Sequence, residues 1–487
     1  MKNDINKNKV LSSLIWKFME RGGTQGIQFI IQIILARLLA PKDYGVIALI
    51  SIFITIANVF VQSGFNTALI QKKNADEIDF SSVFFLSIFV SGLLYCILFF
   101  SAPAIASFYN VKQLVLVLRI LSIILFFGAF NSIQTAEISR KMQFKKLFFS
   151  SLGAIIVSGI AGIILAYMGA GVWALVFQQI INQFLITVNL WFTVKWRPKW
   201  VFSIKRVKEL FSYGWKLLIS SLIDTLYMNL RSLVIGKIYT PQVLGYYNRG
   251  EQFPSILVTN IDGSIQSVML PALAAQQENK RRVRDMVRRS IVTSSFIVFP
   301  IMVGLAVISE PLIKILLTEK WLPSVPFLQI FCVSYALYPI HTANLQAINA
   351  LGRSDIFLKL EIIKKTIGII VLGVSVNYGV YSIAIGMLIV GVISTFINAF
   401  PNLRLLNYSY REQLNDILPS LILSLLMGGV IYNFKLFNMS DWLMLITQIF
   451  FGCILYIGLA KLFKLECFTY LVMTFKEIFI SKRGMTK

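Results

Sequence analysis

The stretch ARLLAPKDYG at residues 36–45 has a counterpart in GKIYTPQVLG at residues 236–245. In each stretch a basic residue precedes a proline by four positions, and a glycine follows that proline by four. Every matched position in the second stretch lies 200 residues after its partner in the first. Since proline ends a helix and glycine permits a tight turn, both stretches are predicted to connect two consecutive helices.

The similarity extends beyond the two connectors. Trp16 has a counterpart in Trp215, and Gly64 has one in Gly263, at nearly the same spacing. Matches in the same order at one spacing predict a duplicated unit of six helices. Two copies offset by six helices cross the membrane in the same direction, so they are predicted to be related by an axis along the membrane normal. Transporters built from such parallel repeats bind their substrates where the repeats meet.

Composition identifies the solvent of the chain. The sequence is 57% hydrophobic and only 14% charged, and its mean hydropathy is +0.74. Apolar runs of about twenty residues recur throughout, which is the length of helix that crosses a hydrocarbon layer about 30 Å thick. The sequence therefore predicts a polytopic membrane protein.

The apolar runs predict fourteen membrane-spanning helices. They lie near 12–36, 44–70, 82–101, 113–136, 147–167, 171–194, 209–236, 243–271, 290–308, 324–349, 359–376, 380–400, 417–433 and 441–462. The predicted fold is all-α, with two six-helix lobes in parallel repeat around a central cavity and two additional C-terminal helices. The predicted domains are an N-lobe at 1–200, a C-lobe at 201–402, and the last two helices with the tail at 403–487.

Lysine and arginine are distributed unequally between the two sides of this predicted topology. They concentrate in the N-terminal tail, in alternate loops at 71–81, 137–146, 195–208, 276–289, 351–365 and 402–416, and in the C-terminal tail. The positive-inside rule therefore predicts that both termini face the cytoplasm. The same asymmetry accounts for the net charge of +24 and favours anionic lipid headgroups, rather than nucleic acid, as the partner of these loops.

Charged and amide side chains also occur inside the predicted spans. In the first helix the polar residues recur at steps of three and four, which places them on one face. The seventh and eighth helices carry similar polar residues. A charge at the centre of a bilayer costs roughly 2.5–3.5 kcal/mol, so these side chains are predicted to line an aqueous cavity.

Signatures of catalysis are not found in the sequence. It contains no GxxxxGK[ST] nucleotide-binding loop, no HExxH motif and no GxSxG motif. Its four cysteines show no CxxC spacing, and a single histidine, His341, forms no metal site by itself. We therefore predict no catalytic residue, no metal and no cofactor.

The chain resembles the Wzx-type polysaccharide flippases of the multidrug/oligosaccharidyl-lipid/polysaccharide (MOP) exporter superfamily. The resemblance lies in WKFMERGGTQGIQFIIQIILARLLAPKDYGVIAL (16–49), SGFNTALIQKK (63–73) and FSIKRVKELFSYGWK (202–216). It implies a flippase that moves an undecaprenyl-pyrophosphate-linked oligosaccharide across the bacterial cytoplasmic membrane by alternating access. The glycan would serve O-antigen, capsule or exopolysaccharide biosynthesis, with a polysaccharide polymerase and chain-length proteins as further partners.

Such a substrate assigns roles to the polar residues of the spans. Arginine suits phosphate oxygens because its guanidinium is a planar fork, and amides suit sugar hydroxyls. The predicted substrate-binding residues are Arg21, Gln25, Gln28, Lys216, Arg231, Arg249 and Gln252. The candidates for coupling to a proton or sodium gradient are Glu20, Asp224, Glu251 and Asp262.

Three alternatives remain open from the sequence. A drug antiporter of the related MATE branch would use Glu20 and Asp224 to bind an organic cation. A flippase for the peptidoglycan lipid precursor would share the predicted architecture. A membrane glycan polymerase or ligase is disfavoured because the longest outward loop, near 309–323, is short.

Overall fold

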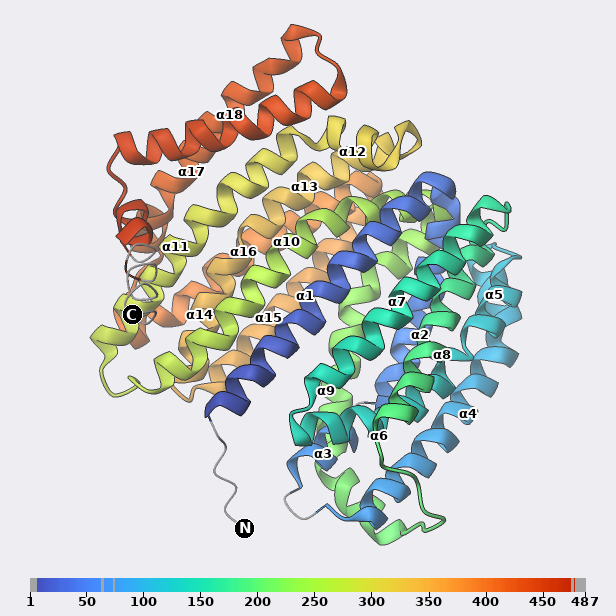
Figure 1. Cartoon of the computed structure of the whole chain (residues 1–487). Coiled ribbons are helices and arrows are strands. Elements are labelled where there is room, and N and C mark those ends of the chain that lie inside the picture. The colour runs from blue at the N-terminus through green and yellow to red at the C-terminus, as the bar shows by residue number, and fades with distance from the viewer. Residues whose placement is uncertain (1–6, 63–64, 73–74, 474–476, 478–487) are drawn as a thin grey trace, which may run out of the picture. The chain divides into compact units, whose positions relative to one another are not determined.

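The computed structural model describes residues 7–62, 65–72, 75–473 and 477, without the side chains of residues 7–11, 13–15, 18, 21 and 213. Throughout these residues every regular element is a helix (Figure 1). The chain divides into two compact units, Met1–Gly245 and Tyr246–Lys487. The predicted all-α class is therefore confirmed. Gly64 and both ends of the chain lie outside the described residues.

The first unit begins with a long helix and ends just after the second connector. Its helices are α1 (Lys7–Leu38), α2 (Pro41–Gln62), α3 (Phe65–Gln71), α4 (Glu77–Tyr109), α5 (Leu114–Leu121), α6 (Ile124–Lys141), α7 (Phe144–Tyr167), α8 (Val172–Thr193), α9 (Ile204–Ile238) and the first turn of α10 (Pro241–Ala274). The predicted division into lobes at residues 200 and 402 stays a prediction.

The second unit contains the rest of α10 and the helices that follow it. These are α11 (Lys280–Val307), α12 (Ser309–Leu317), η1 (Glu319–Ser324), α13 (Val325–Ala336), α14 (Tyr338–Ala350), α15 (Ser354–Ser375), η2 (Val376–Tyr378), α16 (Val380–Leu406), α17 (Tyr410–Tyr432), η3 (Asn433–Phe437) and α18 (Asp441–Leu462).

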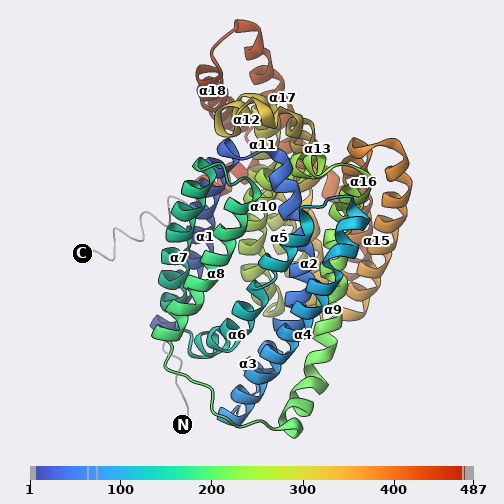
Figure 2. The same ribbon diagram turned by 90° about the vertical axis from the view of Figure 1, so that its right-hand side faces the viewer.

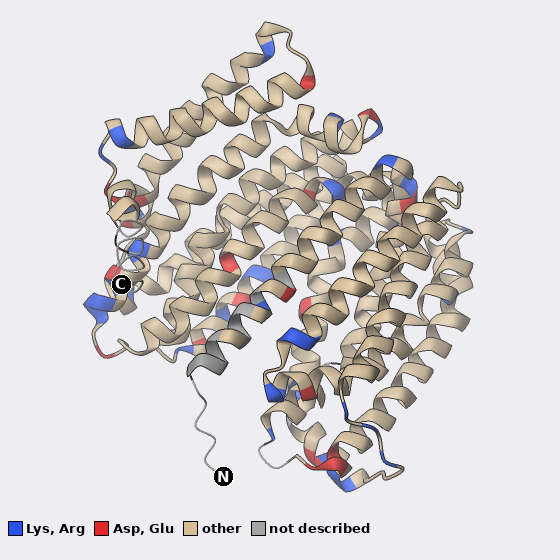
Figure 3. Ribbon diagram, viewed as in Figure 1, with Lys and Arg blue, Asp and Glu red and all other residues tan. Residues whose placement is uncertain are grey.

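Each of the fourteen predicted spans corresponds to one helix or to two consecutive helices. Within the described residues, 12 helices are long and apolar enough to cross a membrane. The other two predicted spans, α1 and α15, also form long helices, but polar side chains interrupt their apolar residues: charged and amide residues in α1, and four charged residues between Lys359 and Lys365 in α15. Most charged residues lie toward helix ends (Figure 3), as a hydrocarbon layer requires.

The two proline connectors form as predicted. The helix α1 ends at Leu38 and α2 begins at Pro41, while α9 ends at Ile238 and α10 begins at Pro241. Proline suits the first position of a helix because its fixed φ is already helical and its missing N–H needs no partner there. The ends of the two helix pairs thus keep the offset seen in the sequence.

The role predicted for the connector glycines is wrong. Gly45 and Gly245 lie within helices, and neither has a positive φ. A Cβ atom on Gly45 would lie 1.6 Å from the carbonyl oxygen of Pro241, and one on Gly245 would lie 2.3 Å from that of Pro41. Each glycine therefore lets its helix approach the start of the other helix, and neither forms a turn.

Two further glycines bring α1 and α8 onto α7 in the first unit. A Cβ on Gly159 would lie 2.3 Å from Ile31 of α1, and a Cβ on Gly162 would lie 2.8 Å from the Cβ of Gln178 on α8. These three helices run side by side (Figures 1 and 2). The close approach fixes the helices that carry the site described below.

A buried amide network joins α17 to α14 and α16 within the second unit. Asn344 of α14 donates to Gln413 of α17 over 2.9 Å, and Asn402 of α16 donates to the side-chain oxygen of Asn344 over 2.7 Å. All three side chains are almost fully enclosed. Because an unpaired amide in an apolar interior is costly, this network fixes the positions of the three helices relative to one another.

Candidate functional site

A polar cavity of about 450 Å³ lies inside the first unit, and we call it the amide pocket. It is lined by Thr24, Gln25 and Gln28 of α1, by Ser51, Ile54, Thr55 and Asn58 of α2, by Ile124 of α6 and Ile155 of α7, and by Gln178, Gln179, Asn182 and Gln183 of α8. Seven of these residues are amides, three carry hydroxyls and none is charged. The volume falls within the ~300–1,000 Å³ that is typical of small-molecule sites.

Several hydrogen-bonding atoms of the amide pocket are not used within the protein. The side-chain oxygens of Gln28, Asn58 and Gln178 are buried and accept no hydrogen bond in the described part of the chain. Leaving such an acceptor unpaired costs about 1–3 kcal/mol. The Thr55 hydroxyl donates to the carbonyl of Ser51 over 2.7 Å, so its oxygen remains an acceptor. The pocket is therefore rich in acceptors that need donors.

A second group of polar residues lies on α10 in the second unit. Arg249 is only 5% exposed, and its guanidinium lies 5.3 Å from the centre of the Trp321 ring. It also donates to the side-chain oxygen of Gln252. Gly250 allows α10 to approach α13 closely, because a Cβ there would lie 2.7 Å from the Cβ of Phe327. A cation is thus held inside a membrane-spanning helix against an aromatic ring.

The two predicted carboxylates of α10 have hydroxyl donors. The Tyr335 hydroxyl donates to Glu251 over 2.9 Å, and the Thr342 hydroxyl donates to Oδ2 of Asp262 over 2.6 Å. The other oxygen of Asp262 is buried and has no hydrogen-bond partner among the described residues. In the same part of the chain no salt bridge involves Asp262, which makes it a suitable place for a proton or a small cation.

The predicted residues on α9 lie in the first unit but do not line the amide pocket. Lys216 and Asp224 are exposed. Arg231 is half-buried, with its guanidinium 5.7 Å from the Tyr227 ring. The structure therefore places these three residues on one long helix without joining them to Gln25 and Gln28.

The charged residues of α1 are only partly described. Glu20 accepts a salt bridge from Lys17 at 3.0 Å, one helical turn away. The side chain of Arg21 lies outside the described residues, so its predicted contact with substrate stays a prediction. On α1 it is Gln25 and Gln28 that the structure places in a cavity.

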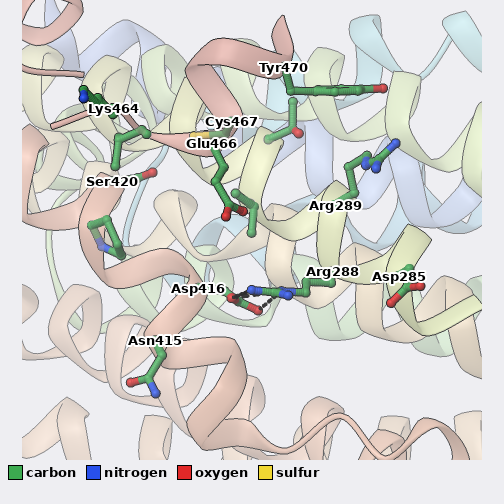
Figure 4. A pocket seen from close by; sticks show the side chains of 14 residues that line it. Asp285, Arg288, Arg289, Asn415, Asp416, Ser420, Lys464, Glu466, Cys467 and Tyr470 are labelled. Atoms are coloured by element: carbon green, nitrogen blue, oxygen red, sulfur yellow. Dashed lines mark hydrogen bonds and ion pairs between the residues drawn. The ribbon is translucent and has the colours of Figure 1, made fainter. Parts of the chain in front are cut away.

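A larger cavity, of about 620 Å³, lies among α11, α17 and the segment that follows α18 (Figure 4). Its best-defined contacts are internal to the protein. Arg288 forms a two-pronged salt bridge with Asp416 at 2.7–3.0 Å, and the Arg289 guanidinium lies 4.6 Å from the Tyr470 ring. Burial raises the pKa of the Cys467 thiol, which opposes formation of a nucleophilic thiolate. We therefore take the amide pocket as the better candidate site.

The prediction from sequence missed more than half of the amide pocket. The residues of α8 form the run QQIINQ at 178–183 inside an apolar span, and steps of three and four between its amides place them along one side of the helix. The contribution of α2 comes from Ser51, Thr55 and Asn58, which recur at steps of three and four. Amides at helical spacing within a span were the signal that could have identified both sets.

Solved structures define the class of fold. The chain superposes on the lipid II flippase MurJ, in its inward closed conformation, with a TM-score of 0.73 and 19% identity, over 93% of this chain and 98% of that one. It superposes on an inward-facing multidrug resistance MATE family transporter of the MOP superfamily with a TM-score of 0.60 and 16% identity, over 78% and 94%. The fold is therefore the one that MOP superfamily transporters share.

The sequence comparisons are more specific than the similarity of fold. Residues 34–326 match a family of polysaccharide biosynthesis proteins, and the chain belongs to that family. The teichuronic acid biosynthesis protein TuaB of Bacillus subtilis is 28% identical over 302 residues, which is 62% of each protein and thus less than two thirds of TuaB. The lipopolysaccharide biosynthesis protein WzxC of Escherichia coli is 25% identical over 87% of this chain and 89% of its own length. The succinoglycan biosynthesis transport protein ExoT of Rhizobium meliloti is 23% identical over 68% and 67%.

Proposed function

We propose that this protein is a flippase that moves an undecaprenyl-pyrophosphate-linked oligosaccharide from the inner to the outer leaflet of the bacterial cytoplasmic membrane. Its family, and the names of its relatives WzxC and ExoT, support a role in the transport step of polysaccharide biosynthesis. The role is transport without catalysis, by alternating access, with both termini in the cytoplasm. A polysaccharide polymerase and chain-length proteins are its proposed partners.

The observation that carries this proposal is the buried Arg249. A guanidinium inside a membrane span is expensive unless it serves a polar ligand or a partner, and this one is only 5% exposed. Its planar donors fit the oxygens of a pyrophosphate in pairs. The aromatic ring of Trp321 and the amide of Gln252 hold the guanidinium in place, so it is oriented before the substrate arrives.

The same proposal includes coupling to a proton or sodium gradient. Asp262 is the strongest of the predicted candidates because it is 7% exposed and accepts a hydrogen bond from the neutral Thr342 hydroxyl. Carboxyl groups inside membrane spans commonly mark proton relays and ion pathways. Binding and release of a proton, or of a sodium ion, would change the charge inside α10 once per cycle.

The fold is equally compatible with a drug antiporter and with a flippase for the peptidoglycan precursor, since both classes are found among its structural neighbours. Family membership favours the polysaccharide flippase. The amide pocket also contains no carboxylate for an organic cation, which argues against drug export through that pocket.

The test is complementation of a bacterial strain from which the gene that encodes this protein has been deleted. Arg249→Ala should abolish surface glycan and cause lipid-linked oligosaccharide to accumulate, while the protein remains in the membrane at its normal amount. Arg249→Lys should restore only part of the export, because a point charge replaces a planar fork. Arg404→Ala, at an exposed arginine of α16, is the matched control and should export normally.

Two results would contradict this assignment. If Arg249 has only a structural role, its replacement should lower the amount of protein, because the groups packed around it lose their partner. Normal export by the double variant Arg21→Ala, Arg249→Ala would remove the head-group proposal altogether.

A further inference from the structure

We infer that the amide pocket is a subsite for an uncharged, hydroxyl-rich sugar residue of the translocated glycan. This inference rests on the proposed function and specifies the kind of sugar that the amide pocket would bind. All of its lining residues belong to the first unit, whereas Arg249 belongs to the second. In the proposed function Arg249 binds the anionic head group, and the amide pocket would bind a sugar of the glycan.

The chemistry of the pocket matches that of a sugar. An amide offers both donors and acceptors on one rigid plane, and a sugar hydroxyl is both donor and acceptor. The enclosed oxygens of Gln28, Asn58 and Gln178 have no donor in the described structure. The last torsion of Gln and Asn is broad, so each amide can turn its oxygen toward a bound hydroxyl without a change in the helices.

The composition of the pocket argues against other ligands. It contains no lysine or arginine to neutralise a uronic acid or a phosphate, and no aspartate or glutamate to neutralise a cation. A charged ligand would lose its hydration without gaining a counter-charge. An apolar ligand would form no hydrogen bond with the ten polar side chains that line the pocket together with three isoleucines. A neutral polyhydroxyl compound satisfies both conditions.

The wall formed by α8 is fixed in position. Gln178 is 1% exposed and lies against Gly162 of α7, where a Cβ would approach its Cβ to 2.8 Å. The helices α7 and α8 are thus in backbone contact behind the pocket. Gln179, Asn182 and Gln183 are less buried and continue the same wall. Amides carried by a fixed helix select a ligand by the positions of its hydroxyls.

The inference predicts a difference in binding between neutral and acidic sugars. The full-length protein, purified into lipid nanodiscs, would be titrated with maltotriose and with a trigalacturonate of the same length, and binding would be followed by calorimetry. We expect the neutral trisaccharide to bind and the acidic one not to bind. In the variant Asn182→Leu, Gln183→Leu, affinity for maltotriose should fall about tenfold or more, as the loss of two hydrogen bonds implies.

A matched control is the exposed Gln113, which makes no capping bond at the start of α5. Gln113→Leu should bind maltotriose as the unaltered protein does. Equal affinities for the unaltered protein and the pocket variant, absence of maltotriose binding, or preferred binding of the acidic trisaccharide would each overturn the inference. A pocket variant that is not recovered folded would be replaced by Asn182→Asp, which keeps the shape and introduces a charge.

The export assay separates this inference from the proposed function. If the pocket variant exports glycan normally and Arg249→Ala does not, the subsite is wrong and the flippase assignment stands. If deletion of the gene leaves surface glycan unchanged, the flippase assignment itself is wrong. If the pocket variant loses export of a neutral glycan but retains export of one with an acidic sugar, both are supported.

Discussion

At the scale of single residues, the connectors were predicted at the correct positions, but the role predicted for their glycines was wrong. The sequence predicts a connector between two helices at each proline, and in the structure one helix ends just before Pro41 or Pro241 and the next begins there. The true role of each glycine could not be predicted from the sequence, because each glycine packs against the proline of the other connector. Gly45 meets Pro241 and Gly245 meets Pro41, so only the folded chain shows which backbone comes close.

The first prediction follows from this contact. Gly45→Ala places a Cβ 1.6 Å from the carbonyl oxygen of Pro241, so the two helix starts must move apart. Overpacking of this kind costs about 1–3 kcal/mol, and we expect a lower melting temperature in detergent and reduced export. Gly153→Ala is the control, since a Cβ there meets no atom within 4 Å. Equal melting temperatures for the two variants would contradict the close approach.

The second prediction concerns Asp262. Asp262→Asn keeps the hydrogen bond from Thr342 but removes the group that binds a proton or cation. We expect normal amounts of protein and a loss of export, together with loss of any dependence on the proton or sodium gradient in membrane vesicles. Glu278→Gln, at an exposed position before α11, should behave as the unaltered protein does. Gradient-dependent export by Asp262→Asn would exclude Asp262 as the coupling group.

At the scale of helices, the sequence specifies which segments become helical and leaves open which faces meet. All fourteen predicted spans are helical, and 12 helices of the described residues are long and apolar enough to cross a membrane. The polar face of α1 was predicted, and its residues Gln25 and Gln28 do line a pocket. The amides of α8 were not predicted, although their spacing in the sequence marks a polar face. What the sequence pattern of one helix does not show is that Gly162 brings α7 against Gln178.

The third prediction belongs to the start of α4. Asp76 and Asp79 form a capping box, and Arg206 of α9 donates to Asp76 over 3.1 Å. The backbone N–H of Asp79 is the main cause that holds the pKa of Asp76 below its usual range, and the Arg206 charge adds to it. Asp76→Ala removes the cap, so we expect a loss of about 0.5–2 kcal/mol in stability, measured as a lower melting temperature at pH 7.

The pH dependence of this cap has a definite sign. A carboxylate with a depressed pKa in the folded state stabilises the protein above its unfolded pKa of about 3.9. That contribution disappears as the pH falls through the folded pKa. The difference in melting temperature between Asp76→Ala and the unaltered protein should therefore be constant from pH 6 to 8 (about two units above both pKa values). A difference that changed steadily across that interval would show that another group is responsible.

At the scale of the whole molecule, the number of spans and the distribution of charge predict two different aspects of the topology, the number of crossings and the orientation. Seven of the helices that are long and apolar enough to cross a membrane lie between Lys42 and Lys280. An odd number of crossings places these two positions on opposite sides of the membrane, whatever the orientation. The excess of basic residues near Lys280 then predicts, by the positive-inside rule, that this position faces the cytoplasm. The number of crossings and the orientation are separate predictions, and either one can be wrong while the other is right.

The last prediction tests both aspects with one pair of variants. In a background without the four native cysteines, Lys42→Cys and Lys280→Cys each place one thiol at an exposed position. A thiol reagent that does not cross membranes should label intact cells through Lys42→Cys and leave Lys280→Cys unlabelled until the cells are opened. The reverse pattern would keep the seven crossings and invert the orientation, so the basic loops would face outward. Labelling of both variants in intact cells would instead mean an even number of crossings, and one of the apolar helices between them would then not span the membrane.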